Sequence, residues 1–128
     1  ERVAEHSGLP FVGQVAAGRT TLAFEQDEHV DFGEMFHRSN RFVLQVKGDS
    51  MIEAHIEDGD FVIVEKRKTA PAGAMVVAQT DEDEATLKYW FPEKTRIRLQ
   101  PANSSMEPIY SRSARVIGVV VGVVRRMR

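Results

Sequence analysis

The chain has 128 residues, a formal net charge of -2 and no cysteine. That length is enough for one domain with a buried core, and the slightly acidic balance argues against a nucleic-acid-binding surface, because such domains are usually basic. The lack of cysteine excludes disulfides and thiolate metal sites, and it suits a reducing cytoplasm. The longest apolar block, Val116 to Val124, is about half as long as a membrane-spanning helix.

The N-terminal part of the chain predicts few regular elements. Residues 1–9 are polar and lack a signal-peptide pattern, so we expect them to be the flexible remnant of a linker. The composition of Phe11 to Val15 is typical of a strand. The small side chains from Ala16 to Gly18 fill little space and suit a narrow groove. Phe32 to Phe36 is expected to form a helical turn.

Beyond Arg41 the sequence predicts mainly strands and turns. Two of the expected strands flank an acidic loop and are expected to form a hairpin. Together, about six or seven strands and a few short helical turns predict a mainly β fold. The strands expected from Arg41 onward are Phe42–Val46, Phe61–Glu65, Ala74–Gln79, Ala85–Phe91, Arg96–Gln100 and Val116–Val124.

The last of these strands is rich in valine, so both of its faces are expected to be buried. Two arrangements satisfy this pattern. The strand from Val116 to Val124 either lies in the centre of the sheet, or it forms the seam of a symmetric dimer, since an apolar strand at an open edge invites pairing with another chain.

The most informative stretch is a turn between two strands. Gly48 allows a backbone conformation that a β-carbon would penalise. Ser50 then stands clear of the strand pairing, beside backbone N–H groups that can bind an oxyanion. A structural interpretation is also open, because Ser50 and Glu53 fit the S-x-x-E capping box at a helix start and serine after glycine is common in turns.

The sequence predicts no metal site and no cofactor. The four histidines lack metal-ligand spacing, and none lies in a motif that favours a Ser-His-Asp triad. The acidic loop from Asp81 to Glu84 lacks the glycine and the terminal glutamate of a calcium loop, so it is most simply a solvated hairpin tip. The histidines are His6, His29, His37 and His55.

Lysine is the remaining candidate for a general base. Strict alternation puts Lys88 on the same strand face as Thr86 and Trp90, and the tryptophan indicates that this face is partly dry. Burial lowers the pKa of a lysine, and its neutral amine can then take the proton of a serine hydroxyl. The alternative is an ordinary solvated lysine, because lysine is seldom buried.

Four short motifs together resemble the self-cleaving domain of LexA-type repressors, which also occurs in UmuD-like mutagenesis proteins and in phage repressors that autodigest. The resemblance runs from about Leu9 to Val124, and the Ser-Met turn combined with the later lysine is its specific part. Alanine before the scissile bond favours the LexA branch, since UmuD-like members more often have cysteine there. The motifs are Ala16-Ala17-Gly18, Gly48-Asp49-Ser50-Met51, Asp58-Gly59-Asp60 and Leu87-Lys88.

The resemblance implies an irregular multi-stranded β domain of the LexA and signal-peptidase type over residues 10–128, which carries self-cleavage and dimerisation. It also implies a role for each site residue. These roles are nucleophile for Ser50, neutral general base for Lys88, oxyanion binding for the backbone N–H groups of Asp49 and Ser50, scissile bond for Ala17-Gly18, and binding in the cleft for Val15 and Ala16.

The resemblance further implies a setting for this chemistry. Members of this family are cytoplasmic homodimers whose cleavage is stimulated by the RecA–single-stranded DNA filament in the SOS response to DNA damage, and the strand from Val116 to Val124 is expected at the dimer interface. No helix-turn-helix is seen and the chain begins at Glu1, so we expect a fragment without the N-terminal DNA-binding domain, and contact with DNA only through that domain. No membrane contact is expected.

Two other functions remain open. A UmuD-like accessory protein of a translesion polymerase would share the chemistry but have another partner. A β-rich dimerisation module without catalysis would use Ser50 only to cap a turn.

Overall fold

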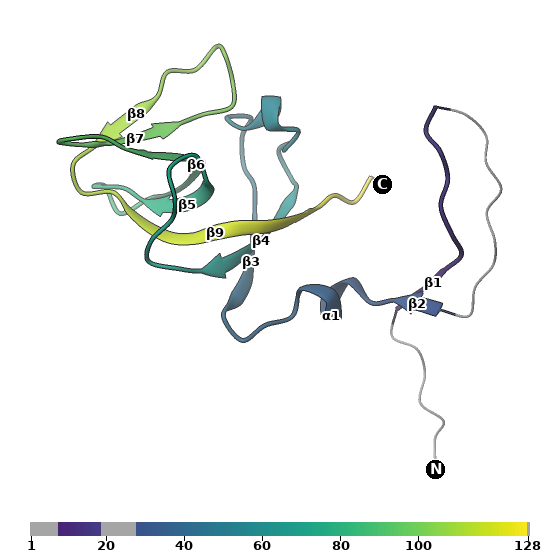
Figure 1. Cartoon of the computed structure of the whole chain (residues 1–128). Coiled ribbons are helices and arrows are strands. Elements are labelled where there is room, and N and C mark those ends of the chain that lie inside the picture. The colour runs from purple at the N-terminus through teal and green to yellow at the C-terminus, as the bar shows by residue number, and fades with distance from the viewer. Residues whose placement is uncertain (1–7, 19–27, 128) are drawn as a thin grey trace. The chain divides into compact units, whose positions relative to one another are not determined.

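A computed structural model describes residues 8–18 and 28–127, which form two compact units, residues 1–37 and 38–128 (Figure 1). In the first unit, β1 (Leu9–Phe11) pairs antiparallel with β2 (Glu28–Val30), and α1 (Phe32–Phe36) follows. The expected helical turn at α1 is confirmed. Its N-cap is Asp31, whose side chain accepts a hydrogen bond from the Glu34 N–H.

The strand expected over Phe11 to Val15 is wrong in its extent. Within residues 9–15, only Leu9 to Phe11 pair with another described strand, in a register that runs from Leu9 opposite Val30 to Phe11 opposite Glu28. The linker expected over residues 1–9, like His6, falls almost entirely outside the described residues.

The second unit is built on a seven-stranded sheet in the order β3-β4-β9-β5-β6-β7-β8, and every neighbouring pair is antiparallel. The mainly β fold is thus confirmed, as is the hairpin of β5 and β6. A short 3-10 helix, η1, lies between β3 and β4. The elements are β3 (Arg41–Gln45), η1 (Ile52–Ala54), β4 (Phe61–Lys66), β5 (Met75–Gln79), β6 (Ala85–Pro92), β7 (Ile97–Gln100), β8 (Ile109–Ser111) and β9 (Arg115–Val124).

The valine-rich strand β9 lies inside the sheet, between β4 and β5, which favours the central of its two expected positions. The pairing is not uniform along its length. Its pairs with β5 end at Val119, whereas its pairs with β4 continue to Val124. The segment from Val120 to Val124 therefore has one paired side and one edge without a strand partner in the described part of the chain.

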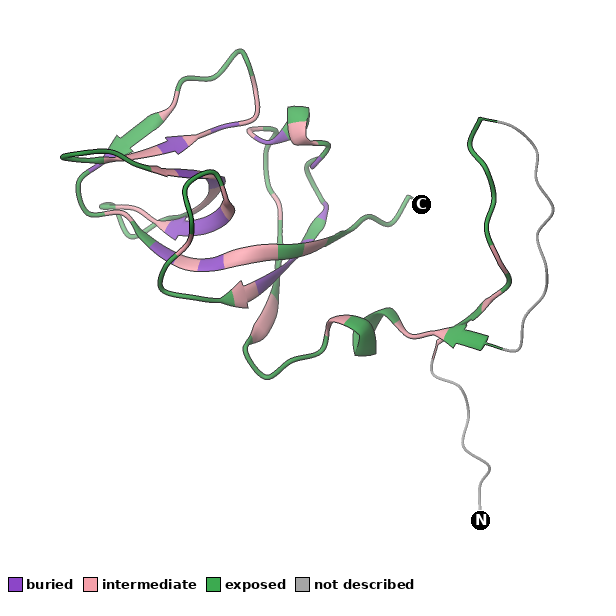
Figure 2. Cartoon of the chain, viewed as in Figure 1, coloured by how far each residue is buried: buried purple, intermediate pink, exposed green. Residues whose placement is uncertain are grey.

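Buried residues lie almost entirely on and beside the strands of the second unit (Figure 2). They form two clusters on opposite faces of the hairpin, because neighbouring residues of a strand point to opposite faces. The first cluster contains Val76, Ala78, Trp90, Leu99 and Val116, and the second contains Val62, Val64 and Val77. Lys88 of β6 lies on the same face of the hairpin as the first cluster, since it is opposite Val76.

Gly118 of β9 lies close against the neighbouring strand β4. A β-carbon built at this position would lie 2.5 Å from Val64 Cγ1 and 2.6 Å from the backbone oxygen of Glu65. The second contact is with backbone that is itself paired in the sheet, so it cannot be relieved by a side-chain rotation.

We expect Gly118→Ala to lower the free energy of unfolding by about 1–3 kcal/mol, the usual range for overpacking, measured by urea denaturation followed by circular dichroism. Gly18→Ala is the matched control, because a β-carbon there meets nothing within 4 Å, and its stability should match that of the parent chain. Equal stability of both variants would contradict the close packing of β9 on β4.

Candidate active site

Ser50 lies on a turn that begins at Gly48, directly after β3. Gly48 has a φ of 96°, a backbone conformation that side chains with a β-carbon rarely adopt. Its N–H donates a 2.6 Å hydrogen bond to Asp58 Oδ1. The sequence-based expectation of a glycine-dependent turn at this point is therefore confirmed.

The capping-box interpretation of this turn is wrong. The residue that caps η1 is Met51, and it makes no side-chain capping bond. The Glu53 carboxylate instead accepts hydrogen bonds from the backbone N–H and the hydroxyl of Ser104, at 2.8 and 2.7 Å, and these bonds lower its pKa. The hydroxyl of Ser50 is thus left for another partner.

A second turn, at Asp58 to Asp60, is bonded to the residues between β3 and the serine turn. The backbone of Val46 exchanges 2.8 Å hydrogen bonds with Gly59 and Asp60. Asp60 is only 2% exposed, and its carboxylate accepts from Arg125 Nε and Nη2 at 2.8 and 2.9 Å. These bonds lower the pKa of Asp60, so the buried carboxyl is charged and paired at neutral pH.

Lys88 is buried on β6, with 7% of its surface exposed. The register puts it opposite Val76, and Trp90 follows two residues later on the same face. Among the described residues it has no ion pair with a carboxylate. Burial therefore lowers the pKa of its ammonium group, and the alternative of an ordinary solvated lysine is wrong.

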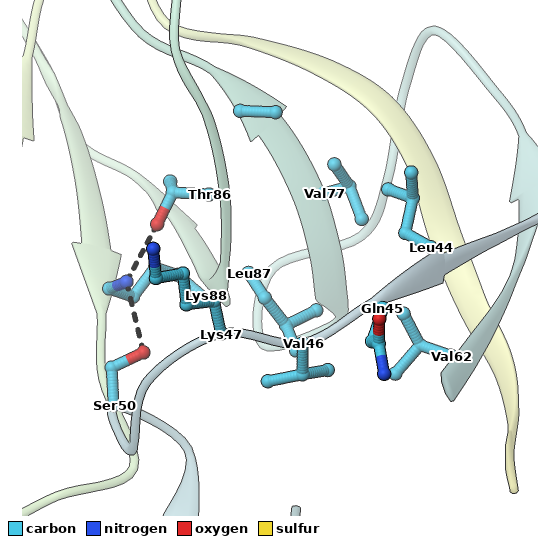
Figure 3. Close-up of a pocket in the computed structure, with 11 residues that line it drawn as sticks. Leu44, Gln45, Val46, Lys47, Ser50, Val62, Val77, Thr86, Leu87 and Lys88 are labelled. Carbon is cyan, nitrogen blue, oxygen red and sulfur yellow. Dashed lines mark hydrogen bonds between the residues drawn. The ribbon is translucent and has the colours of Figure 1, made fainter. Parts of the chain in front are cut away.

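The amine of Lys88 lies between two hydroxyl groups (Figure 3). Its Nζ is 3.2 Å from Ser50 Oγ and 2.7 Å from Thr86 Oγ1. A neutral amine has two N–H groups and one lone pair, so donation to Thr86 leaves the lone pair able to accept the proton of Ser50. The geometry permits proton transfer from the serine to the lysine.

A groove of about 240 Å³ opens beside this pair. Ser50, Thr86 and Lys88 lie at one end of it in Figure 3, and the other end is mainly apolar, with Gln45 beside Val62. Such a groove suits an extended segment with small or aliphatic side chains. The apolar lining comes from Leu44, Val46, Val62, Val77 and Leu87.

The backbone of the serine turn has carbonyl groups that are bonded and N–H groups that are not. The Asp49 and Ser50 carbonyls accept from Asn103 Nδ2 and the Ala102 N–H, at 2.9 and 2.8 Å. The N–H groups of Asp49 and Ser50 donate to no acceptor among the described residues. They are available for a ligand oxygen.

The predicted site residues fall into two groups. Ser50, Lys88 and the N–H groups of the turn belong to the second unit, where the fold brings them together. The predicted cleavage segment, Val15 to Gly18, belongs to the first unit. Its residues are exposed, and Val15 has 83% of its surface accessible. The roles assigned to all of these residues remain predictions.

Comparison with known proteins identifies the family of the chain. The family described as Peptidase S24-like matches residues 10–121. The chain belongs to the Peptidase S24-like family. It is also 49% identical over 123 residues to proteins named LexA repressor from Staphylococcus aureus strains Newman, Mu3 and N315. Each alignment covers 93% of this chain and 59% of the relative, so this Peptidase S24-like chain spans about three fifths of the length of those relatives.

Metal chemistry has no candidate site within residues 8–18 and 28–127. No group of three or more histidine, cysteine, aspartate or glutamate side chains is placed there to hold an ion. In the same ranges, no helix has the length and apolar character needed to cross a membrane.

Three contributors to the site were not predicted from the sequence as parts of it. Thr86 was placed on the face of Lys88 but given no role. Asn103 bonds to the serine turn at Asp49, 54 residues earlier in the chain, and Arg125 bonds to Asp60 in the second turn, 65 residues earlier. Alternation alone could have indicated Thr86, because residues two apart on a strand share a face. No local pattern indicates the other two.

The missing counter-charge of Lys88 has a measurable consequence for stability. The folded lysine has a lowered pKa, so between that value and the ordinary value near 10.4 the unfolded chain binds more protons than the folded chain. Stability attributable to Lys88 therefore rises with pH in this window. We expect the unfolding free energy of the parent chain, relative to Lys88→Met, to increase from neutral to alkaline pH in urea titrations. A difference that does not change with pH would contradict the burial of an uncompensated amine.

Proposed function

We propose that the chain is the self-cleaving serine-peptidase domain of a LexA-type repressor. The observation that carries this proposal is the buried amine of Lys88, 3.2 Å from the hydroxyl of Ser50, in a chain of the Peptidase S24-like family. A hydroxyl next to a buried, uncompensated amine is the arrangement that an activated serine needs.

The proposed reaction begins with Lys88 neutral. Ser50 Oγ attacks the carbonyl carbon of Ala17 and passes its proton to Lys88 Nζ. The tetrahedral intermediate collapses when Lys88 returns that proton to the leaving amine of Gly18, which breaks the Ala17-Gly18 bond. Water, deprotonated by the same amine, then hydrolyses the ester on Ser50 and restores both side chains.

The turn supplies the second requirement of this chemistry. The attacked carbonyl oxygen becomes an oxyanion, and the backbone N–H groups of Asp49 and Ser50 are proposed to bind it. Their lack of any other acceptor in the described part of the chain supports this role. Donors that are held in place before the reaction stabilise the developing charge without a cost of reorganisation.

The cleavage segment is the proposed substrate because its side chains fit the groove. Ala16 and Ala17 have small side chains that can lie close to Ser50, and Val15 is apolar like most of the groove lining. Substrate and catalytic groups belong to one molecule, so no bimolecular encounter is needed. The proportion of molecules in which the segment is docked then limits the rate.

Regulation is proposed to act on that proportion. A RecA–single-stranded DNA filament that binds the docked form better would raise its population, without supplying any catalytic group. In a cytoplasmic repressor of the SOS response, cleavage would separate this domain from a DNA-binding domain. Operator binding would weaken because two-site attachment is lost.

The first test is self-cleavage of the unmodified chain without a partner. We expect incubation at alkaline pH to cut the Ala17-Gly18 bond, as detected by mass spectrometry, and the rate to rise with pH until Lys88 is fully neutral. Ser50→Ala and Lys88→Ala should both reduce the cut product below detection, since nucleophile and base act as one unit.

Each rival function predicts a different result. A dimerisation module without catalysis would stay intact at every pH. If the Lys88→Ala variant cuts itself at the parental rate, Lys88 is not the general base and the dyad is excluded. A UmuD-like accessory protein would cleave itself equally well, but it would bind a translesion polymerase in a pull-down assay.

We also propose a homodimer that pairs through the segment from Val120 to Val124. The edge of this segment that faces away from β4 has no strand partner in the described ranges. It also carries exposed apolar side chains, including Val123 and Val124, each 42% exposed. Such an edge is stabilised when a second copy adds its own strand.

A charge on this edge should therefore oppose association. We expect Val124→Asp to raise the dimer dissociation constant about tenfold or more, because a carboxylate would lose its hydration in the interface, as measured by sedimentation velocity over a range of concentrations. Val43→Asp places the same charge on an exposed position of β3 and should leave the constant unchanged. The reverse pattern would place the interface on β3.

A further inference from the structure

The loop between β7 and β8 lies against the serine turn. The Ala102 N–H donates to the Ser50 carbonyl at 2.8 Å, and the Glu53 N–H donates to the Ala102 carbonyl at 2.7 Å. Asn103 Nδ2 donates to the Asp49 carbonyl at 2.9 Å. Backbone contacts of this kind form whatever the side chains are, whereas the bond from Asn103 depends on its amide group.

The Asp49 carbonyl accepts from Asn103 Nδ2 at 2.9 Å and from the Ile52 N–H at 3.2 Å, and the shorter bond, from Asn103, helps to determine where a neighbouring N–H points. The Asp49 carbonyl and the Ser50 N–H belong to one trans peptide unit, which is planar, so the two groups point in opposite directions. Holding the carbonyl toward Asn103 therefore directs the Ser50 N–H away from the loop. That N–H has no acceptor among the described residues.

Asn103 is itself held in one orientation. Its Oδ1 accepts from the N–H and the hydroxyl of Ser105, at 3.0 and 2.7 Å. A backbone N–H can only donate, so the group that faces Ser105 must be the amide oxygen, and the NH₂ group must face Asp49. The carboxylate of Glu53 holds the adjacent Ser104 and so keeps the loop against the turn.

We propose that Asn103 is a positioning residue for the oxyanion site, which fixes the peptide unit between Asp49 and Ser50 so that its N–H is directed at the reacting carbonyl oxygen. This inference rests on the proposed self-cleavage, and it assigns a function to a side chain that does not contact the substrate. The oxyanion N–H is useful only if it is held in place before the reaction. Without the bond from Asn103, the Asp49 carbonyl would be held only by the longer bond from the Ile52 N–H, at 3.2 Å.

The test compares two substitutions of Asn103 with a matched control. In Asn103→Asp, the side chain keeps its shape and its bonds with Ser105, but an oxygen replaces the donor and repels the Asp49 carbonyl. Asn103→Ala removes the group altogether. The matched control is Asn40→Asp, which also replaces an asparagine by an aspartate. Asn40 lies on an exposed turn of the same unit, outside the serine turn.

The readout is the pH profile of self-cleavage of the full chain, in variants whose thermal unfolding shows that they are folded. We expect both Asn103 variants to lower the alkaline plateau about tenfold, which is less than the 10²- to 10³-fold cost of losing an oxyanion donor. The apparent pKa of the rate should not change, because Lys88 is untouched. A shifted apparent pKa or a parental plateau would overturn the inference, and Asn40→Asp should match the parent chain.

A second measurement does not depend on cleavage and so separates this inference from the proposed function. The ¹³C shift of the Asp49 carbonyl and the ¹⁵N shift of the Ser50 amide report on the same peptide unit. Both should move in the Asn103 variants and stay in place in Asn40→Asp. Unchanged shifts would overturn the positioning role, whether or not the parent chain cleaves itself, whereas moved shifts without cleavage by the parent chain would refute only the proposed function.

Discussion

The site depends on a lysine amine that is buried without an opposite charge. Within the described chain, Lys88 Nζ contacts two hydroxyl groups, those of Ser50 and Thr86, and has no ion pair with a carboxylate. A carboxylate at this place would hold the amine in its charged form, since an opposite charge within a few ångströms raises the pKa of a lysine. The hydroxyls satisfy its hydrogen bonds and leave the effect of burial intact.

Three carboxylates near the serine turn are bonded to partners other than Lys88. Asp58 accepts the N–H of Gly48, Glu53 accepts from Ser104, and Asp60 pairs with Arg125. Each therefore stabilises the turn rather than the charge on Lys88. The turn is fixed by acidic groups, while the strand face that carries the lysine remains apolar, with Val76 and Trp90 in the same layer as Lys88.

Those features that local patterns encode were predictable from the sequence. Alternation along β6 placed Lys88 beside Trp90, and Gly48 identified the turn that carries Ser50. Two strands were missed, β2 and β8. Each is three residues long, too short for alternation to be recognised. The C-terminal strand admitted two positions, because burial of both faces has the same sequence pattern in a sheet centre and in a dimer seam.

The supports of the serine turn were unpredictable for a different reason. Arg125 and Asn103 act across long sequence separations, and neither lies in a pattern that specifies its partner. Arginine after a strand and asparagine in a loop are both ordinary surface residues in a sequence. Their effect comes from the order of strands, which brings the end of β9 beside β4 and the β7–β8 loop beside the serine turn.

The same strand order links the proposed dimer edge, Val120 to Val124, to the turn that carries Ser50 through a series of hydrogen bonds. Val124 ends β9, and Arg125 follows at once, bonded to the Asp60 carboxylate and to the His55 carbonyl. Asp60 is in turn bonded through its backbone to Val46, two residues before Gly48. A change in the position of the strand end would therefore move the exposed Arg125 away from the buried carboxylate of Asp60, and a buried carboxylate left without its partner is costly. The turn and the strand end are thus constrained to move together.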